Sequence, residues 1–331
     1  MGTRIVVVGA GMVGTEMVEI LRKRPRFAIE EITILARTER RMVIDDEIYA
    51  VEVARPEGFD GAKFAFFAGT EGEAGASKEF AKEAVRRGCI VIDNGSDFRM
   101  DPDVPLIIPE VNPKALKGHC GLIASPNCST IIMLMALAPL HRINPIAKVY
   151  VTTLQAVSGS GTDGIRELEA QQRAILQGSL FEREIYPHPI FGNVIPAIGS
   201  FVDNEHSSEE LKMLYETQKI LGRKIPVYAT CVRVPIMNGH SMNIVVEFQN
   251  KIHDHIFKKM CDTLVRSPGV IVYDEPDKGL YPLPLLATGK DEVFVGRIRQ
   301  RDLYTLEMFV SGDNILKGAA LNAVQIAELL F

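Results

Sequence analysis

Apolar and polar positions at the start of the chain follow the order typical of a parallel α/β sheet. Ile5 to Val8 is a continuous β-branched run that indicates a buried strand, and apolar residues from Met17 to Leu21 recur at helical spacing. Ile32 to Leu35 then predicts a second strand. This βαβ succession has the length expected for two parallel strands joined by a helix.

The alternation of strands and helices continues to about residue 125 and then changes. Phe64 to Phe67 and Cys89 to Ile92 predict strands, with a helix between them from Ser77 to Arg87. Strand-like runs with few helices between them follow, which predicts an α+β lobe with a largely antiparallel sheet. These runs are Lys148 to Ala156, Val227 to Arg233 and Asn243 to Phe248.

The length of the chain and its final residues complete the expected division into domains. A chain of 331 residues with 47% apolar content is more naturally split between two domains than packed into one. Asp313 to Phe331 carries apolar residues at helical spacing, which predicts a packed helix, and its assignment to the first domain is what the family resemblance given below implies. The predicted domains are residues 1–127 with 313–331, and residues 128–312.

Charge and hydropathy argue against nucleic acid and membrane partners. A net charge of −5 and a pI near 5.9 give no general attraction for DNA, RNA or acidic lipid. The longest apolar stretch, Ile131 to Leu140, is too short to span a bilayer and predicts a buried helix. The N-terminus runs into a strand without the apolar segment of a signal peptide. We therefore expect a cytoplasmic protein.

The cysteines support the same compartment. There are five, an odd number, and no two form a C-x-x-C pair, which argues against a disulfide framework and against a zinc site. We expect a reducing environment and no metal centre. Four of the five are expected to be small buried apolar residues, namely Cys89, Cys120, Cys231 and Cys261.

A glycine series between the first strand and the first helix is a candidate dinucleotide site. Gly9, Gly11 and Gly14 form a G-x-G-x-x-G pattern that also contains Met12 and Val13. In such a site the glycines allow the tight turn, the approach of the pyrophosphate and close helix packing. The amides at the helix N-terminus then bind phosphate. The alternative is that these glycines serve the turn alone.

The end of the second strand favours NADP over NAD. It lacks the acidic residue that would bind a ribose hydroxyl group. Arg37 can pair bidentately with a 2′-phosphate, and Thr38 can donate a further hydrogen bond. Glu39 lies beside them and weakens the argument, so a solvated basic loop is the alternative.

Cys128 is the candidate nucleophile. It precedes the apolar run that starts at Ile131, which predicts that it lies in the first turn of a buried helix, where amides and the helix dipole favour a thiolate. A thiolate beside a nicotinamide predicts attack on a carbonyl, hydride exchange and an acyl thioester that a second nucleophile resolves. His240, in a glycine-containing loop between two strand-like runs, is the candidate acid/base.

These motifs resemble those of aspartate-semialdehyde dehydrogenases along nearly the whole chain. The resemblance implies a Rossmann-type parallel-sheet domain and an α+β catalytic and dimerisation domain, an α/β architecture similar to that of glyceraldehyde-phosphate dehydrogenase. It also implies a homodimer, which in some members pairs into a tetramer. The segments that carry it are the series from Gly9, Asn94 to Arg99, Pro126 to Cys128, Gln155 to Gly161, Arg233 to Ser241 and Asp313 to Ala320.

The implied reaction is the reversible, NADP-dependent interconversion of L-aspartyl-4-phosphate with L-aspartate-4-semialdehyde and phosphate. It would feed lysine, methionine and threonine synthesis. The resemblance gives Cys128 the role of nucleophile, His240 that of acid/base, and Gln155 that of orienting the intermediate. Arg233 resembles the clamp for the substrate carboxylate. The residues implied to bind phosphate are Arg99, Lys212 and Asn127.

The resemblance also assigns the remaining binding residues. Glu209 resembles the ligand of the substrate ammonium group, and its spacing from Lys212 puts both on one helix face. An ordinary surface ion pair is the alternative for these two. The residues implied to bind NADP are Gly9, Gly11, Met12, Val13, Gly14, Arg37, Thr38, Ser158, Gly159, Gly161 and Asn314.

Two other functions compete with this assignment. N-acetylglutamyl-phosphate reductase and glyceraldehyde-phosphate dehydrogenase resemble this chain in fold and thiol chemistry. Asn127-Cys128-Ser129, Gln155 and the Glu209/Lys212 pair match neither of them well. The second rival is a non-catalytic homologue that acts as a binding or structural protein. The presence of both Cys128 and His240 argues against it.

Overall fold

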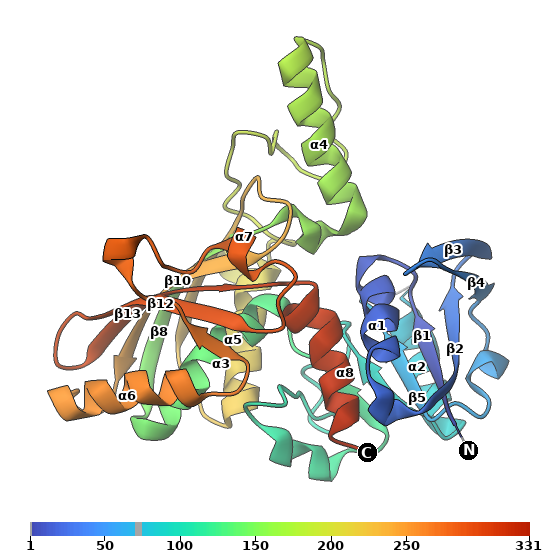
Figure 1. Ribbon diagram of the computed structural model, residues 1–331, viewed down its shortest axis with the longest axis horizontal. Helices are drawn as coiled ribbons and strands as arrows, with labels where there is room; N and C mark the ends of the chain where they lie inside the picture. The colour runs from blue at the N-terminus through green and yellow to red at the C-terminus, as the bar shows by residue number, and fades with distance from the viewer. Residues whose placement is uncertain (1, 70–74) are drawn as a thin grey trace. The chain divides into compact units, whose positions relative to one another are not determined.

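The computed structural model describes residues 2–69 and 75–331, which form two compact units (Figure 1). The first unit holds Met1–Asn127 and Ala319–Phe331, and the second holds Cys128–Gly318. Within the described ranges, no helix has both the length and the apolar character needed to cross a membrane.

A seven-stranded sheet with the order β3-β4-β2-β1-β5-β6-β7 forms the centre of the first unit. The described pairs are parallel except β3 with β4, which form a hairpin at one edge. The central strands are buried, as expected for a parallel sheet with both faces covered. The strands are β1 (Thr3–Val8), β2 (Ile29–Ala36), β3 (Arg40–Ile44), β4 (Glu47–Val53), β5 (Phe64–Phe67), β6 (Ile90–Asp93) and β7 (Leu122–Ala124).

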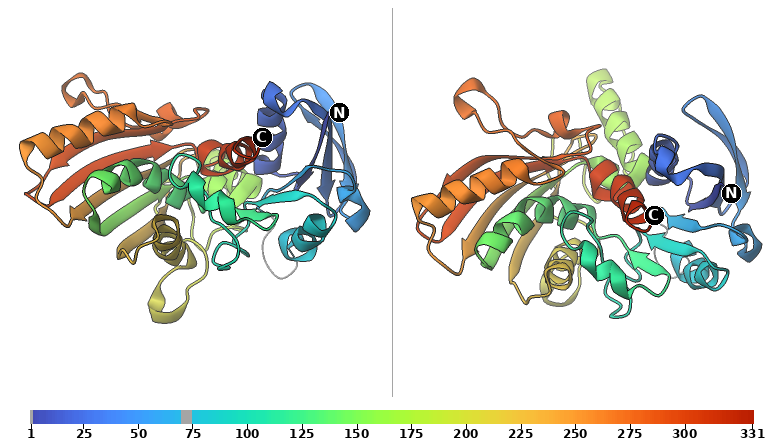
Figure 2. Two further views of the ribbon diagram at one scale, coloured as in Figure 1. Left: turned by 90° about the horizontal axis from the view of Figure 1, so that it is seen from below. Right: turned by 60° about the horizontal axis from the view of Figure 1, so that its bottom comes forward.

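Helices cover both faces of this sheet. From β1, the helix α1 (Met12–Arg22) leads to β2 on one side, whereas α2 (Ala76–Arg86) leads from β5 to β6 on the other side. Right-handed crossovers that run in opposite directions place the two helices on opposite faces (Figure 2). The C-terminal helix α8 (Leu321–Glu328) contacts α1, and the final residue, Phe331, packs edge-to-face on Phe27.

The second unit is built on a six-stranded sheet with the order β11-β12-β13-β10-β8-β9. The three inner pairs are antiparallel, whereas β8 with β9 and β11 with β12 are parallel. The sheet is therefore mixed, which qualifies the largely antiparallel sheet predicted from the sequence. Its strands are β8 (Ile146–Gln155), β9 (Val227–Arg233), β10 (His240–Phe248), β11 (Val270–Val272), β12 (Val293–Gln300) and β13 (Thr305–Gly312).

One face of this second sheet is covered by helices α3 (Cys128–Ile143), α5 (Ser208–Leu221) and α6 (Asp254–Arg266) (Figures 1 and 2). The other face carries exposed side chains, among them the stacked pair Tyr150 and Tyr228. A further helix, α4 (Gly161–Gln177), projects away from the sheet, and a short α7 (Pro284–Ala287) precedes β12. Along the chain, α4 and α5 lie between β8 and β10, and α6 follows β10. The second unit therefore has more helices between its strands than the sequence pattern indicated.

The boundary of the C-terminal return lies at Ala319, later than the Asp313 predicted from the sequence. The reason is local hydrogen bonding. Asp313 accepts from the Asn238 side chain and from the amide of Gly289, both at 2.8 Å, and Asn314 accepts from the amide of Gly239 at 3.0 Å. These bonds hold residues 313–318 in the second unit.

Candidate active site

The glycine turn of the first unit has the geometry of a dinucleotide site. Gly9 adopts φ 107°, and a Cβ at Gly14 would lie 1.8 Å from the carbonyl oxygen of Gly9, so neither position accepts a side chain without strain. In contrast, a Cβ at Gly11 would meet no heavy atom of the described chain within 4 Å. Met12 and Val13 form the first turn of α1, where main-chain amides have no acceptor within the helix.

A pocket of about 600 Å³ adjoins this turn within the first unit. Gly9, Gly11, Arg37 and Thr38 line it, together with residues from the start of α2. Arg40 lines it too, and its Nη2 donates to the carbonyl oxygen of Ala10 in the glycine turn at 2.9 Å. Arg40 was not predicted from the sequence, because a basic residue at the start of an exposed edge strand carries no signal of its own.

Arg99 and Asn127, the two predicted phosphate ligands of the first unit, are both buried. The Arg99 guanidinium donates from Nε to the carbonyl oxygen of Ser125 at 2.9 Å and from Nη2 to that of Asn94 at 2.7 Å. Both acceptors follow the carboxyl ends of neighbouring strands, β7 and β6. The main chain therefore fixes the position of this cation at the edge of the sheet where ligands of open α/β sheets bind.

The second unit gathers several predicted residues at one edge of its sheet. Because β10 runs antiparallel to β8, the start of β10 lies beside the ends of β8, β9 and β13. Gln155 ends β8 and pairs with Arg233, which ends β9. His240 begins β10 opposite Gly312, the last residue of β13. Residues distant in sequence are thus brought together by register alone.

Cys128 is the first residue of α3 and is partly exposed. The rest of the helix as far as Leu140 is buried, as the apolar run predicted. The main chain at Gly318 passes close to Cys128, because a Cβ on this glycine would lie 3.0 Å from that of Cys128. A thiol at a helix N-terminus is favoured as the thiolate by the helix dipole. Of the other cysteines, Cys89 and Cys231 are buried as predicted, whereas Cys120 is exposed and Cys261 is partly exposed.

His240 is fully buried, and its ring orientation is fixed. Its Nδ1 accepts a hydrogen bond from the amide of Ala156 at 3.1 Å, so the neutral ring carries its proton on Nε2. Burial, and secondly the charge of Arg233, hold the pKa of His240 well below its ordinary value of 6.5. Nε2 itself has no hydrogen-bond partner in the part of the chain that the structure describes. A buried donor without a partner indicates a place for an acceptor on a ligand.

Arg233 and His240 meet at Gly159. The Arg233 Nη1 donates to the carbonyl oxygen of Ala156 at 2.6 Å. A Cβ at Gly159 would lie 2.7 Å from this Nη1 and 3.4 Å from Cε1 and Nε2 of His240. A side chain at position 159 would therefore have to displace the Arg233 guanidinium or the His240 ring.

Gln155 is anchored through its amide nitrogen. Nε2 donates to the hydroxyl group of Ser129, the neighbour of Cys128, and to Oε1 of Glu209 at 3.0 Å. Glu209 in turn pairs with Lys212 at 3.4 Å from the next turn of α5. Because Glu209 is only 6% exposed, this is not the ordinary surface ion pair that the sequence left open. The other amide atom, Gln155 Oε1, is buried and has no partner among residues 2–69 and 75–331.

Two of the predicted cofactor residues of the second unit, Ser158 and Asn314, are hydrogen-bonded to each other. Asn314 donates to the hydroxyl group of Ser158 at 2.9 Å, and Ser158 donates to Asn238 at 2.9 Å. Gly161 adopts φ 76° at the start of α4. Asn238 was not predicted from the sequence, although its position in the Asn-Gly turn before His240 was visible there. This network ties the turn after Gln155 to the turn before His240.

Two family models match the chain. The model described as "Semialdehyde dehydrogenase, NAD binding domain" matches residues 4–119, and "Semialdehyde dehydrogenase, dimerisation domain" matches residues 137–317. Among curated relatives, the aspartate-semialdehyde dehydrogenase of Aquifex aeolicus is 43% identical, over 100% of this chain and 98% of its own length.

Solved structures agree with these matches. The aspartate semialdehyde dehydrogenase II of Vibrio cholerae complexed with ASA superposes with a TM-score of 0.92, at 38% identity, over 100% of this chain and 98% of its own. The Candida albicans aspartate semialdehyde dehydrogenase with NADP gives a TM-score of 0.77 at 25% identity, over 100% and 98%. The chain therefore belongs to the aspartate-semialdehyde dehydrogenase family of enzymes.

Proposed function

We propose that this enzyme reduces L-aspartyl-4-phosphate to L-aspartate-4-semialdehyde with NADPH, reversibly and through a thioester on Cys128. The observation that supports this most strongly is the sheet edge of the second unit. There Gln155, Arg233 and His240 converge, and Gln155 is hydrogen-bonded to Ser129, next to Cys128. This set supplies a nucleophile, a proton-exchanging group and a cation for a carboxylate, which are the groups that the reaction needs.

The pocket of the first unit fits a dinucleotide phosphate. The close approach of Gly14 to Gly9 and the open space at Gly11 suit a pyrophosphate at the N-terminus of α1. Arg37 and Arg40 give this pocket two cations, which favours a 2′-phosphate and hence NADP. The Candida albicans relative, whose structure was solved with NADP, supports the same preference. When bound, NADPH supplies a hydride to the thioester carbon.

Cys128 begins the reaction. Its thiolate attacks the acyl carbon of the aspartyl phosphate, the C–O bond to phosphate breaks, and a thioester remains on the sulfur. After reduction, the hemithioacetal collapses, the C–S bond breaks, and the aldehyde leaves with the thiolate restored. The position of Cys128 at the N-terminus of α3 stabilises the thiolate at both steps.

His240 exchanges the proton that this sequence requires. The carbonyl oxygen of the thioester gains a proton as the hemithioacetal forms and loses it as the hemithioacetal collapses. Because Nδ1 is occupied by the amide of Ala156, Nε2 is the atom that makes this exchange. A neutral, fixed Nε2–H also stabilises charge on the oxygen before the proton moves.

The remaining polar residues position the substrate. Arg233 would pair with the α-carboxylate through its planar guanidinium, and Glu209 with the ammonium group. Lys212, Arg99 and Asn127 would bind the phosphate group. Gln155 would direct its unpartnered Oε1 toward the intermediate.

We further propose that the protein is a cytoplasmic homodimer and that its product serves lysine, methionine and threonine synthesis. All five cysteines are free, which suits a reducing compartment.

The matched dimerisation model supports the dimer. We assign the dimer interface to the exposed face of the second sheet, which carries the stacked Tyr150 and Tyr228. Light scattering of the wild-type chain and of Tyr228→Asp tests this, since the variant is expected to shift toward the monomer.

Phosphate-dependent reduction of NADP by L-aspartate semialdehyde tests the proposed reaction. We expect activity that requires phosphate, and a higher kcat/KM with NADP than with NAD. The same assay with N-acetylglutamate semialdehyde and glyceraldehyde 3-phosphate tests the enzymatic rivals. A folded, NADP-binding protein that reduces cofactor only with one of these rival substrates, or with none of the three, would overturn the proposed substrate.

A further inference from the structure

The segment that follows α4 has no regular structure of its own. Residues 179–194 form neither helix nor strand, yet four of their main-chain amides are hydrogen-bonded to side chains of α4. A loop of this length needs hydrogen-bond acceptors from elsewhere for such amides. Two polar side chains of α4 provide them.

Glu167 is the first of the two and is 7% exposed. Its Oε2 accepts from the amide of Glu184 at 2.9 Å and from that of Ile185 at 2.6 Å. Its Oε1 accepts from Nε2 of Gln171, one helical turn further along α4, at 2.9 Å. The carboxylate therefore acts only as an acceptor, and three donors converge on it.

Gln171 is the second and is fully buried. Its Oε1 accepts from the amide of Ile190 at 2.8 Å and from that of Phe191 at 3.0 Å. Its Nε2 is the donor to Glu167. We name Glu167 and Gln171 the α4 pair. Together they bind four main-chain amides of the segment, and each side chain has the donor and acceptor pattern that the other needs.

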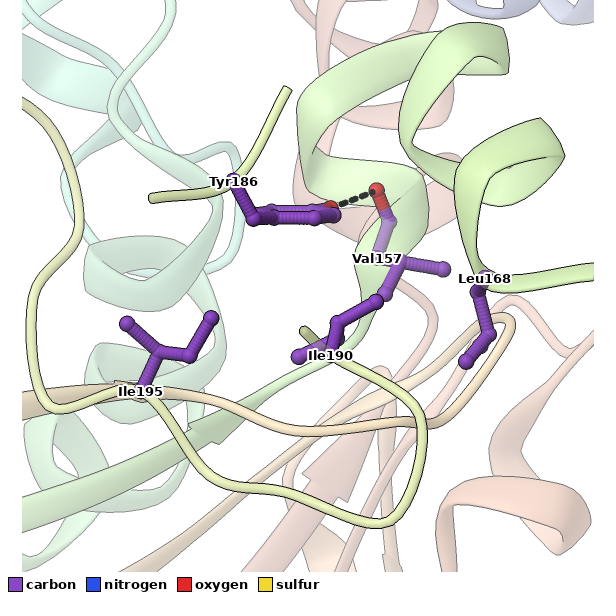
Figure 3. Close-up of a cluster of buried hydrophobic side chains, with 5 residues drawn as sticks. All are labelled: Val157, Leu168, Tyr186, Ile190 and Ile195. Atoms are coloured by element: carbon purple, nitrogen blue, oxygen red, sulfur yellow. Dashed lines mark hydrogen bonds between the residues drawn. The ribbon is translucent and has the colours of Figure 1, made fainter. Parts of the chain in front are cut away.

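An apolar cluster lies beside the α4 pair and leads to the sheet edge (Figure 3). Its five members are Val157, Leu168, Tyr186, Ile190 and Ile195. The Tyr186 hydroxyl group donates to the carbonyl oxygen of Val157 at 3.4 Å, and burial raises the pKa of Tyr186, which keeps it a neutral donor. A Cβ at Gly164 of α4 would lie 2.6 Å from this hydroxyl oxygen, so the position of Tyr186 depends on that glycine.

Ile195, the residue that follows this segment, pairs with the main chain of Arg233. The amide of Ile195 donates to the carbonyl oxygen of Arg233 at 2.9 Å, and the amide of Arg233 donates back to Ile195 at 2.8 Å. The Arg233 guanidinium is bound to Ala156, which precedes Val157. The segment thus contacts, through Tyr186, the turn on which the Arg233 side chain rests, and it continues directly into the residue that pairs with the Arg233 main chain.

We propose that Glu167 and Gln171 are positioning residues that hold Arg233 in the orientation that binds the substrate carboxylate. This inference rests on the role of Arg233 proposed above. If the α4 pair is broken, the segment samples other arrangements, and the competent orientation of Arg233 is occupied for a smaller fraction of the time. The apparent affinity for substrate is the intrinsic affinity multiplied by that fraction, so it falls as the fraction falls. The chemical step in the correctly bound complex is unchanged.

An exchange of the two side chains tests this directly. Glu167→Gln removes the acceptor for Nε2 of Gln171, because the one oxygen of the new amide accepts from the segment and its nitrogen then faces a second donor. Gln171→Glu puts two carboxylates together and removes the donor between them. The double variant Glu167→Gln with Gln171→Glu restores every donor and acceptor with the order reversed. Loss of a hydrogen bond to a charged group changes the equilibrium between the arrangements of the segment by a factor of roughly ten or more.

We therefore expect each single variant to raise the KM for L-aspartate semialdehyde about tenfold, with kcat and the KM for NADP little changed. The double variant should bring the KM for L-aspartate semialdehyde most of the way back to the wild-type value. Glu169→Gln and Gln172→Glu make the same chemical changes at exposed positions of α4 and serve as matched controls. Gly164→Ala is an independent variant, whose Cβ would lie 2.6 Å from the Tyr186 hydroxyl oxygen and 2.7 Å from the carbonyl oxygen of Val157, so it disturbs the contact between the segment and the turn and should raise the same KM.

The outcomes separate this inference from the proposed function. Arg233→Lys should raise the KM for the semialdehyde strongly, and a normal KM in that variant would refute the role of Arg233 itself. If Arg233→Lys behaves as expected but folded Glu167→Gln and Gln171→Glu keep a wild-type KM, the α4 pair does not position Arg233. Single variants that lose thermal stability and active fraction without a change in KM would likewise reduce the pair to a structural role. A double variant with no recovery of KM would contradict the exchange of hydrogen bonds.

Discussion

The amide of Ala156 donates a hydrogen bond to Nδ1 of His240 across 3.1 Å. A proton cannot be added at Nδ1 while that amide points at it, so the bond and the buried position favour the neutral ring in the same way. Ala156 also accepts from Arg233 through its carbonyl oxygen. One residue of main chain thus fixes the two side chains proposed to exchange a proton and to bind the substrate carboxylate.

The stability of the protein should depend on pH through His240. In the folded protein the pKa of His240 lies well below 6.5, whereas in the unfolded chain it returns to about 6.5. The unfolded state therefore binds the additional proton first as the pH falls. The stabilising contribution is complete above pH 6.5 and is lost below it, by up to about 1.4 kcal/mol per pH unit until the folded pKa is reached.

Chemical denaturation between pH 5 and 8 measures this dependence. The wild type should lose stability below pH 6.5 more steeply than His240→Asn, whereas the exposed control His188→Asn should follow the wild type. Identical slopes in the wild type and in His240→Asn would show that the buried ring is not held neutral.

The close approach of Gly318 to Cys128 predicts a loss of rate from a single methyl group. In Gly318→Ala, a Cβ would lie 3.0 Å from that of Cys128, so the thiol must shift by a few tenths of an ångström. A small displacement of a nucleophile slows the chemical step, here by about tenfold to a hundredfold in kcat.

Single-turnover kinetics, together with NADPH binding followed by the fluorescence of the reduced nicotinamide, checks this effect. Binding should be unchanged, because the glycine turn is untouched. The matched control is Gly118→Ala, where a Cβ would meet nothing within 4 Å in the described chain. A normal kcat in Gly318→Ala would mean that the geometry of Cys128 tolerates this contact.

Arg37 and Arg40, the two arginines that line the pocket of the first unit, should determine the proposed preference for NADP over NAD. Leucine at position 37 or 40 removes a cation that lines the pocket, and each replacement should raise the KM for NADP by roughly tenfold to a hundredfold. The KM for NAD should change much less in Arg37→Leu. Arg40→Leu also loses the bond to Ala10, so a modest effect on NAD is expected there.

Steady-state kinetics with both cofactors provides the test, with Arg41→Leu as a control outside the pocket lining. An equal loss for NADP and NAD in Arg37→Leu would argue that this residue supports the turn and does not bind a 2′-phosphate.

The sequence predicted those helices and strands that are marked by an unbroken run of apolar residues. The run from Ile131 to Leu140 predicted a buried helix because every position is apolar, and α3 is buried there on all sides. The hairpin of β3 and β4 escaped prediction because most of its residues are exposed. Its turn is made by Asp45 and Asp46, both with positive φ, and two aspartates are not the usual signal for that turn.

The candidate site shows the same limit. Cys128 was identified from a local pattern, and the family resemblance extended the set to residues such as Gln155 and Glu209. Contacts that depend on tertiary register could not be foreseen, such as Gly159 against Arg233 or the α4 pair with residues 184–191. A buried Glu and Gln one helical turn apart look like an exposed polar face in the sequence, and only the fold shows that they are covered.

Mass spectrometry tests the proposed thioester on Cys128 directly. The enzyme is mixed with L-aspartate semialdehyde and NADP without phosphate, quenched in acid and digested. We expect an aspartyl adduct on the peptide that contains Cys128, its disappearance on addition of phosphate, and no adduct in a folded Cys128→Ala variant. Full catalytic activity in Cys128→Ala, or an adduct on a different residue, would contradict the proposed mechanism.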